Sequence, residues 1–191
     1  MNPKILLMTP NIKGTKGGIN RIQPPLGLGF LAAVLIEQGY EVIIRDTALE
    51  GYETQQELTG STVLIGETDE QIAEFIRQTE PAIVGISITF SSLADSAKNI
   101  AKITKNLLPQ TPVVVGGNHV TNTARDYNFA HSNNQPALTK LFEELILDEN
   151  IDYAMIGEAD FEFPKLVECL INKNRGGDIS EISNLAHKTR G

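Results

Sequence analysis

The stretch IVGISITFSSLADSAKNIAKITKNLLPQTPVVV, residues 83–115, contains two apolar runs of strand length on either side of one amphipathic segment. The runs at 83–87 and 112–115 are rich in Val and Ile, as expected for strands that are buried on both faces. The segment 94–108 between them carries apolar residues at helical spacing. Two strands joined by a helix form a right-handed crossover, which predicts a parallel sheet.

The same alternation extends in both directions along the chain. Further strand-like runs occupy residues 5–8, 41–44 and 152–156, and helical patterns cover residues 28–38, 69–79, 136–147 and 162–172. An alternating order of strands and helices predicts an α/β domain with a five-stranded parallel sheet. We expect this domain to span residues 1–173. The tail 174–191 is polar and has no apolar periodicity that would indicate packing, so we interpret it as a linker.

Two connections are longer than is usual in an α/β domain, at residues 47–68 and 118–135. Connections of this length are usually functional or mobile. Both follow the carboxyl ends of strands, where ligands bind in open parallel sheets. A third loop, residues 9–18, is rich in glycine and follows the first strand, and we expect it to be flexible. The sequence therefore predicts a ligand crevice at this edge of the sheet.

The residues at these strand ends offer hydroxyls, amides and bare backbone rather than catalytic groups. Ser87 and Thr89 could bond a ligand or simply cap the next helix. Glu158 is a candidate general base, but a carboxylate near a helix start more often interacts with backbone amides. The histidines His119, His131 and His187 are scattered, without zinc-site spacing. We expect no catalytic residue and no metal held by protein side chains.

Composition excludes several classes of partner. The chain has 191 residues, with 16 Lys and Arg against 24 Asp and Glu, giving a net charge of -8. This balance argues against nucleic-acid binding. No apolar run approaches the roughly 18 residues that span a bilayer, and the N-terminus does not resemble a signal peptide. The sequence thus predicts a cytoplasmic protein. The single cysteine, Cys169, is interpreted as a small buried hydrophobic residue.

Four segments in this order resemble the N-terminal cobalamin (vitamin B12)-binding domain of cobalamin-dependent radical SAM enzymes. They are PPLGLG at 24–29, EPAIVGIS at 80–87, VVVGGNHVT at 113–121 and DYAMIGEAD at 152–160. The resemblance implies a flavodoxin-like (Rossmann-like) three-layer sandwich on which the corrin lies, with the nucleotide tail inserted among the strand ends. It assigns to cofactor binding Asn11, Gln23, Pro24, Pro25, Leu26, Gly27, Ser87, Thr89, Phe90, Gly116, Gly117, His119, Gly157 and Glu158.

The resemblance also implies a role for several of these positions. Asn11 and residues 23–27 would border the corrin, and Ser87 with Thr89 would hydrogen-bond the tail. The paired glycines 116–117 would let the tail pass. His119 and Glu158 would lie near the corrin edge or the tail.

Two departures from related families refine this expectation. The loop 11–18 lacks the Asp-x-His-x-x-Gly motif with which methionine-synthase-like domains supply a histidine to cobalt. The radical SAM group is therefore favoured, with the tail displaced from cobalt and no histidine from that motif in its place. The chain also lacks the Cys-x-x-x-Cys-x-x-Cys motif of the catalytic domain, so S-adenosylmethionine and the iron-sulfur cluster would belong to a C-terminal radical SAM domain absent from this sequence.

The expected function is to bind cobalamin and position the corrin for methyl transfer or for related radical SAM chemistry, such as oxidative cyclisation. The chain would not be catalytic on its own. The alternative is a stand-alone flavodoxin-like regulatory or carrier module. A phosphorylated receiver would need clustered acids after the first strand and an Asp after the third, and residues 9–11 and 87–89 supply neither. A flavin carrier would need a hydroxyl-rich phosphate loop, which Thr9 and Thr15 support weakly.

Overall fold

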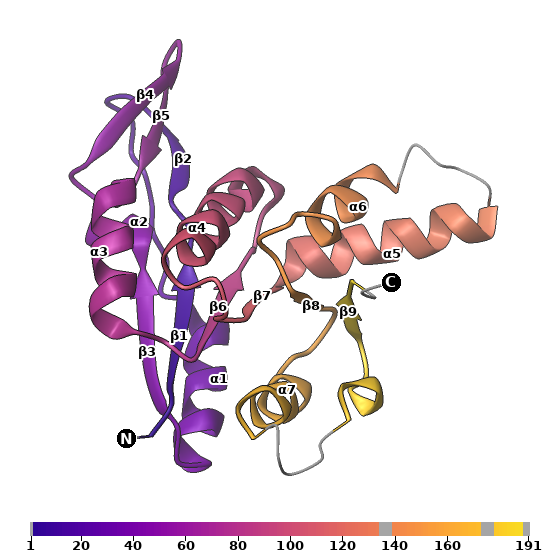
Figure 1. Cartoon of the computed structure of the whole chain (residues 1–191). Helices are drawn as coiled ribbons and strands as arrows, with labels where there is room; N and C mark the ends of the chain where they lie inside the picture. The colour runs from indigo at the N-terminus through magenta and orange to yellow at the C-terminus, as the bar shows by residue number, and fades with distance from the viewer. Residues whose placement is uncertain (1, 134–138, 173–177, 189–191) are drawn as a thin grey trace.

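A six-stranded sheet forms the centre of the computed structural model, which describes residues 2–133, 139–172 and 178–188 (Figure 1). The strand order is β3-β1-β6-β7-β8-β9. The strands are β1 (Lys4–Thr9), β3 (Glu41–Asp46), β6 (Ile83–Ser87), β7 (Val113–Gly116), β8 (Tyr153–Met155) and β9 (Leu185–His187). The first five are parallel and have the order of a flavodoxin-like sheet. The predicted α/β, flavodoxin-like fold is confirmed.

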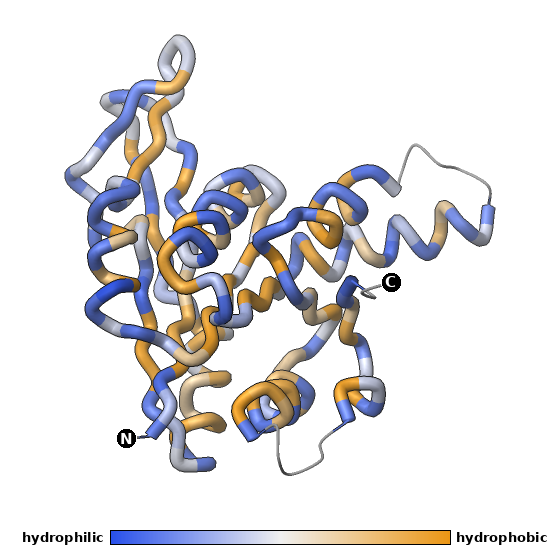
Figure 2. Tube along the Cα trace, in the orientation of Figure 1, coloured by the Kyte–Doolittle hydropathy of each residue, from blue (hydrophilic) through white to orange (hydrophobic). Residues whose placement is uncertain are grey.

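Helices cover both faces of the sheet. One face packs against α1 (Leu26–Glu37) and α7 (Glu162–Ile171). The other packs against α3 (Asp69–Thr79), α4 (Ala94–Leu107), α5 (Asn118–Asn133) and α6 (Lys140–Ile146). The result is a three-layer sandwich in which hydrophobic residues concentrate in the central strands, while hydrophobic and hydrophilic residues alternate along the helices (Figure 2).

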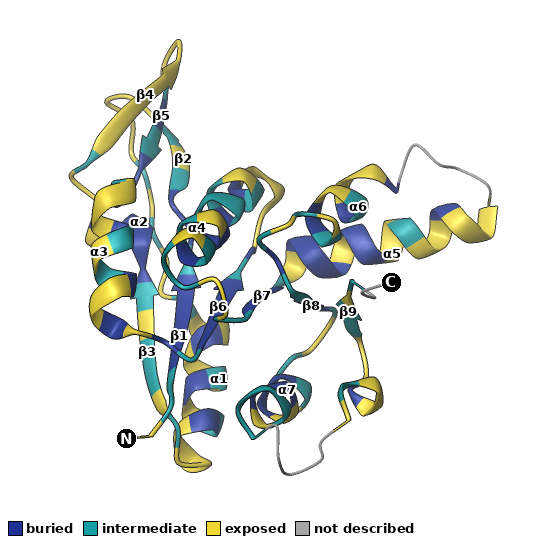
Figure 3. Cartoon of the chain, in the orientation of Figure 1, coloured by how far each residue is buried: buried dark blue, intermediate teal, exposed yellow. Residues whose placement is uncertain are grey.

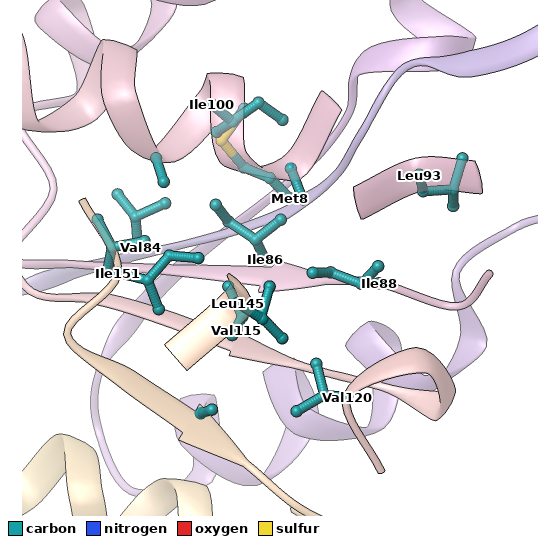
Figure 4. Close-up of a cluster of buried hydrophobic side chains, with 14 of the residues drawn as sticks. Met8, Val84, Ile86, Ile88, Leu93, Ile100, Val115, Val120, Leu145 and Ile151 are labelled. Atoms are coloured by element: carbon teal, nitrogen blue, oxygen red, sulfur yellow. The ribbon is translucent and has the colours of Figure 1, made fainter. Parts of the chain in front are cut away.

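The core follows from the alternation of side chains along buried strands. In β6, Val84 and Ile86 point into the cluster beneath α4, together with Met8 of β1 and Ile100 of α4 (Figure 4). Ile83 belongs to the cluster on the opposite face. Each fully buried aliphatic side chain contributes about 1.5–3 kcal/mol to folding. The sheet is therefore fixed from both sides, and its carboxyl edge has a defined shape.

A capping box explains why α3 begins at Asp69, as the sequence predicts. The Thr68 hydroxyl accepts a hydrogen bond from the Gln71 backbone N–H at 3.3 Å, and the Gln71 side chain accepts one from the Thr68 backbone N–H at 2.8 Å. Two of the amides that a helix start leaves without partners are satisfied in this way.

The sheet has one strand more than predicted. β9 pairs antiparallel with β8, with Ala186 opposite Ala154. A short 3-10 turn at Ile179–Glu181 precedes β9, and Ile182 is buried against the α1 and α7 side of the core. The described part of the tail, residues 178–188, therefore packs on the domain. The prediction missed it because a three-residue edge strand produces no recognisable apolar run.

Both long connections, expected to be functional or mobile, contain helices or strands in their described residues, whereas residues 134–135 of the second lie outside the described part. Residues 118–133 form α5, which buries Val120, Ala124 and Ala130. The sequence did not indicate this helix because polar residues interrupt its apolar spacing. The predicted helix at 136–147 is α6 from Lys140 to Ile146, and residues 136–138 lie outside the described part.

The connection at 47–68 folds into a short helix and a hairpin. The elements are α2 (Thr47–Glu50), β4 (Gln55–Thr59) and β5 (Thr62–Ile65). β5 pairs with both β4 and β2 (Ile12–Thr15), which gives a small antiparallel sheet in the order β2-β5-β4. The glycine-rich loop after β1 thus contains a strand instead of being flexible throughout. Figure 3 shows that β4, in this small sheet, is exposed along its whole length.

Within the described ranges, no helix has the length and apolarity that a bilayer-spanning helix requires.

Candidate functional site

A cavity of about 690 Å³ lies at the carboxyl edge of the parallel sheet. Its floor is formed by the ends of β1, β6 and β7, with Thr9, Ser87 and Gly116 among the lining residues. The first turn of α1 forms one side, and the loop after β8 completes the rim. We call this cavity the crevice. It lies where the strand order reverses between β1 and β6, which is the general location of ligands in open α/β sheets.

Most of the predicted cofactor-binding residues line the crevice. Those that do are Gln23, Pro24, Pro25, Leu26, Gly27, Ser87, Thr89, Phe90, Gly116, Gly117, Gly157 and Glu158. They come from four separate segments of the chain, and the fold brings them to one edge. Asn11 and His119 do not line the crevice.

Asn11 is buried at the base of the small sheet. Its side-chain Nδ2 donates a hydrogen bond to the Glu67 carbonyl at 2.8 Å, and its Oδ1 is buried with no hydrogen-bond partner among the described residues. The Glu67 carboxylate in turn accepts two hydrogen bonds from Arg45, one of them from Nε at 3.1 Å. These contacts attach the hairpin to the edge of the main sheet.

His119 is buried behind the crevice wall, in the first turn of α5. Its ring Nδ1 lies 3.0 Å from the Ser91 hydroxyl, and its backbone N–H donates to the Ile88 carbonyl at 3.0 Å. Burial lowers the pKa of His119 below its usual value, and the charge of Lys98 lowers it further. A neutral ring held in this way is suited to joining two loops.

The paired glycines 116–117 differ in their surroundings. A Cβ on Gly116 would make ordinary contacts with Met155 at 3.7–3.8 Å. A Cβ on Gly117 would lie 2.8 Å from the Ile88 carbonyl oxygen, and Gly117 has a φ of +101°. Gly117 is thus required by the close approach of the Ile88 backbone, whereas Gly116, which lines the crevice floor, could accommodate a Cβ.

The crevice carries few charges. Arg21 is the one cationic residue among the described lining residues, and Asp46, Glu158 and Asp160 are the acids. The Asp46 carboxylate accepts a hydrogen bond from the Leu49 N–H at the start of α2. Leu26 and Phe90 are 72% and 67% exposed at the rim. An apolar rim with few charges suits a large, mostly neutral ligand.

Sequence reasoning missed several lining residues. They are Leu7, Thr9, Pro10, Ile12, Arg21, Ile22, Leu28, Leu31, Asp46, Ala48, Gly85, Ile86, Leu93, Val114, Val115, Asn118, Met155, Ala159, Asp160 and Phe163. Arg21 and Ile22 directly precede the segment 23–27, so extending that segment would have found them. Asp46 is the last residue of β3, and Ala48 lies in α2, at the start of the connection 47–68 that the sequence placed at this edge of the sheet.

No group of three or more His, Cys, Asp or Glu side chains in the described ranges could hold a metal ion. Cys169 is half-buried against the core, and burial raises the pKa of its thiol.

Comparison with known proteins adds an independent line of evidence. Residues 13–132 match the B12 binding domain family. The chain is 30% identical over 190 residues to cytidylyl-2-hydroxyethylphosphonate methyltransferase from Streptomyces wedmorensis, covering 98% of this chain and 32% of that protein. It is 31% identical over 189 residues to an uncharacterized methyltransferase from Pyrococcus horikoshii, covering 98% and 33%. The chain thus spans about a third of the length of these two relatives.

A solved structure supports the fold. A cobalamin-binding protein from Desulfitobacterium hafniense superposes with a TM-score of 0.50 and 17% sequence identity, over 89% of this chain and 60% of that one.

Proposed function

The chain belongs to the B12-binding domain family, and on this premise we propose that the crevice binds cobalamin and holds the corrin ring for a reaction completed by another domain. The observation that carries this proposal is the convergence of four segments on one open, weakly charged cavity at the strand ends.

Several glycines expose their backbone to the crevice, where a ligand such as cobalamin could lie close to the chain. A Cβ on Gly27 or Gly157 would meet no atom within 4 Å, and one on Gly116 would make only ordinary contacts. Backbone without side chains allows a ligand to approach closely. We assign the floor around Gly116 to the nucleotide tail and the rim around Gly27 to the corrin edge.

The polar groups of the crevice suit amide and phosphodiester partners. Ser87 and Thr89 present hydroxyls that can donate to or accept from a ligand. Arg21 supplies a positive charge for the single phosphodiester of the tail. These residues bind and orient the cofactor, while the chemistry is the cofactor's own.

The loop after β1 contains no histidine that could replace the tail as a ligand of cobalt. No histidine lines the crevice in the described part of the chain, and the Nδ1 of the buried His119 is engaged with Ser91. We therefore propose that the tail lies in the crevice away from cobalt and that no histidine of this chain coordinates the metal.

The reaction served by this domain is proposed to be a methyl transfer. When bound, cobalamin supplies a cobalt centre that can carry a methyl group. Two relatives that match almost the whole chain are methyltransferases about three times its length. A radical SAM domain with an iron-sulfur cluster, C-terminal in the longer protein, would then supply the remaining chemistry. Oxidative cyclisation is a second reaction that the same arrangement would serve.

The location of the site is tested with a matched pair of variants in α1. Gly27 lines the crevice, whereas Gly29 is exposed on the same helix outside it, and a Cβ on either would meet open space. Gly27→Phe should weaken hydroxocobalamin binding about tenfold or more, equivalent to about 1.4 kcal/mol. Gly29→Phe should bind like the wild type. Equilibrium dialysis followed by absorbance measures both, and equal affinities for the two variants would contradict the proposed location.

A further inference from the structure

The first turn of α5 contacts the loops on both sides of β7. β6 and β8 flank β7 in the sheet, and the loop after each strand contributes residues to the crevice lining, which we call the β6 wall and the β8 wall. Thr89 and Phe90 belong to the β6 wall, and Gly157 with Glu158 to the β8 wall. The separation of these walls determines what fits between them.

His119 connects α5 to the β6 wall. Its ring Nδ1 lies 3.0 Å from the Ser91 hydroxyl, which is 28 residues away in the chain. Its backbone N–H donates to the Ile88 carbonyl at 3.0 Å. Residues 88 and 91 bracket Thr89 and Phe90, so these two contacts hold the exposed part of the wall from both ends.

Thr121 connects the same turn to the β8 wall. Its hydroxyl oxygen accepts a hydrogen bond from the Gly157 N–H at 2.8 Å, over a separation of 36 residues. The hydroxyl also donates to the Gly117 carbonyl at 3.2 Å. Gly157 has a φ of +79°, which a side chain would oppose. The turn of the β8 loop is therefore anchored at the point where it enters the crevice.

Both side chains are shielded from water, since His119 is 4% and Thr121 8% exposed. Each of the two hydrogen bonds thus joins a buried side chain of α5 to an exposed loop residue, Ser91 in one case and Gly157 in the other. Thr123, two residues further along α5, provides a contrast. Its hydroxyl donates only to the His119 and Val120 carbonyls of its own helix. Of these three side chains, only those of His119 and Thr121 connect α5 to a crevice wall.

We propose that His119 and Thr121 are positioning residues that together fix the separation of the two crevice walls and thereby the affinity for the cofactor. Neither lines the crevice. The inference rests on the proposed function, because the affinity that it explains is that for cobalamin. It also assigns His119 a different role from contact with the corrin or the tail.

The Thr121 contact is tested with Thr121→Val, which keeps the shape of the side chain and removes the acceptor for the Gly157 N–H. We expect about tenfold weaker hydroxocobalamin binding, with restoration in Thr121→Ser. Thr123→Val is the matched control, because it makes the same change on the same helix without a wall contact, and it should bind like the wild type.

The His119 contact is tested by rescue with amides of different length. The Oδ1 of Asn reaches the place of the histidine Nδ1, whereas a Gln amide extends past it. We expect His119→Asn to retain binding within about threefold and His119→Gln to lose about tenfold. A purely structural requirement for bulk would favour the longer side chain instead.

A measurement on the free protein separates this inference from the proposed function. In the wild type the Gly157 amide proton should be protected from exchange with solvent, and Thr121→Val should remove that protection. A wild type that fails to bind hydroxocobalamin would overturn the proposed function and this inference with it. Binding by the wild type together with unchanged affinity in Thr121→Val and His119→Gln would overturn the inference alone.

Discussion

Two adjacent glycines at the end of β7 illustrate how a single motif serves two purposes. Gly117 has a positive φ and lies against the Ile88 backbone, while a Cβ on Gly116 would make only ordinary contacts with Met155. From the sequence, both were assigned to passage of the tail, because a pair of glycines does not reveal which one is required by the fold. The structure gives a folding reason for Gly117, although both glycines line the crevice.

We expect Gly117→Ala to destabilise the domain by about 2–3 kcal/mol, since it adds a clash with the Ile88 carbonyl to backbone strain. Gly116→Ala should leave the free energy of unfolding within about 0.5 kcal/mol of the wild type. Urea denaturation monitored by circular dichroism measures both. Similar stabilities for the two variants would show that the Ile88 contact is not the reason for Gly117.

We expect the buried His119 to make the stability of the domain depend on pH. Because the pKa of His119 is lowered in the folded state, by burial and then by Lys98, the unfolded chain binds the proton more readily. Stability should therefore decrease as the pH falls below about 6.5, the ordinary value for histidine. Of the three histidines, only His119 is buried, since His131 and His187 are exposed.

The test compares unfolding free energies at pH 7.5 and pH 5.5. The wild type should be less stable at the lower pH, and His119→Asn should show a smaller decrease because it removes the titrating group. A decrease of the same size in both proteins would assign the effect to other residues.

At the scale of elements, apolar periodicity was sufficient for those that bury a continuous face. The strands β1, β3, β6, β7 and β8 and most of the helices were predicted within a few residues of their bounds. α5 was missed because Asn, Thr and His occupy much of its sequence, and its burial depends on contacts with the strand ends. β9 and the hairpin were missed because their stability comes from pairing with distant strands rather than from local pattern.

In the described part of the tail, residues 178–188, the side chain of Ile182 is buried. Ile182 packs against the core on the α1 and α7 side, between the 3-10 turn and β9. We expect Ile182→Ala to lower the free energy of unfolding by about 2 kcal/mol. Glu181→Ala, an exposed neighbour, should change it by less than about 0.5 kcal/mol. Thermal and urea unfolding test this pair, and equal stabilities would indicate that residues 178–188 do not pack on the domain in solution.

At the scale of the whole molecule, the sequence predicted where in the fold the crevice lies better than it predicted which residues line it. The strand ends follow from the fold class, so the segments 23–27, 87–90, 116–117 and 157–158 could be placed at one edge before any coordinates were known. The contribution of β3 through Asp46, and the burial of Asn11 and His119 behind the walls, depend on how loops fold back. That information is not local in the sequence.

The residues that line the crevice also bear on the proposed function. This lining supplies hydroxyls, backbone and apolar surface, and the acids Glu158 and Asp160 stand without an adjacent nucleophile or base pair among the described lining residues. Such a lining is suited to binding and orienting a ligand. The two longer methyltransferase relatives are consistent with a division of labour between domains.

Cobalamin binding by the crevice is tested most directly by titrating the purified chain with hydroxocobalamin and recording the visible spectrum before and after desalting. We predict about one cobalamin retained per chain, with a spectrum characteristic of a tail displaced from cobalt. Loss of all cobalamin on desalting, with the spectrum of the free cofactor throughout the titration, would contradict the proposed function and favour a flavodoxin-like regulatory or carrier module.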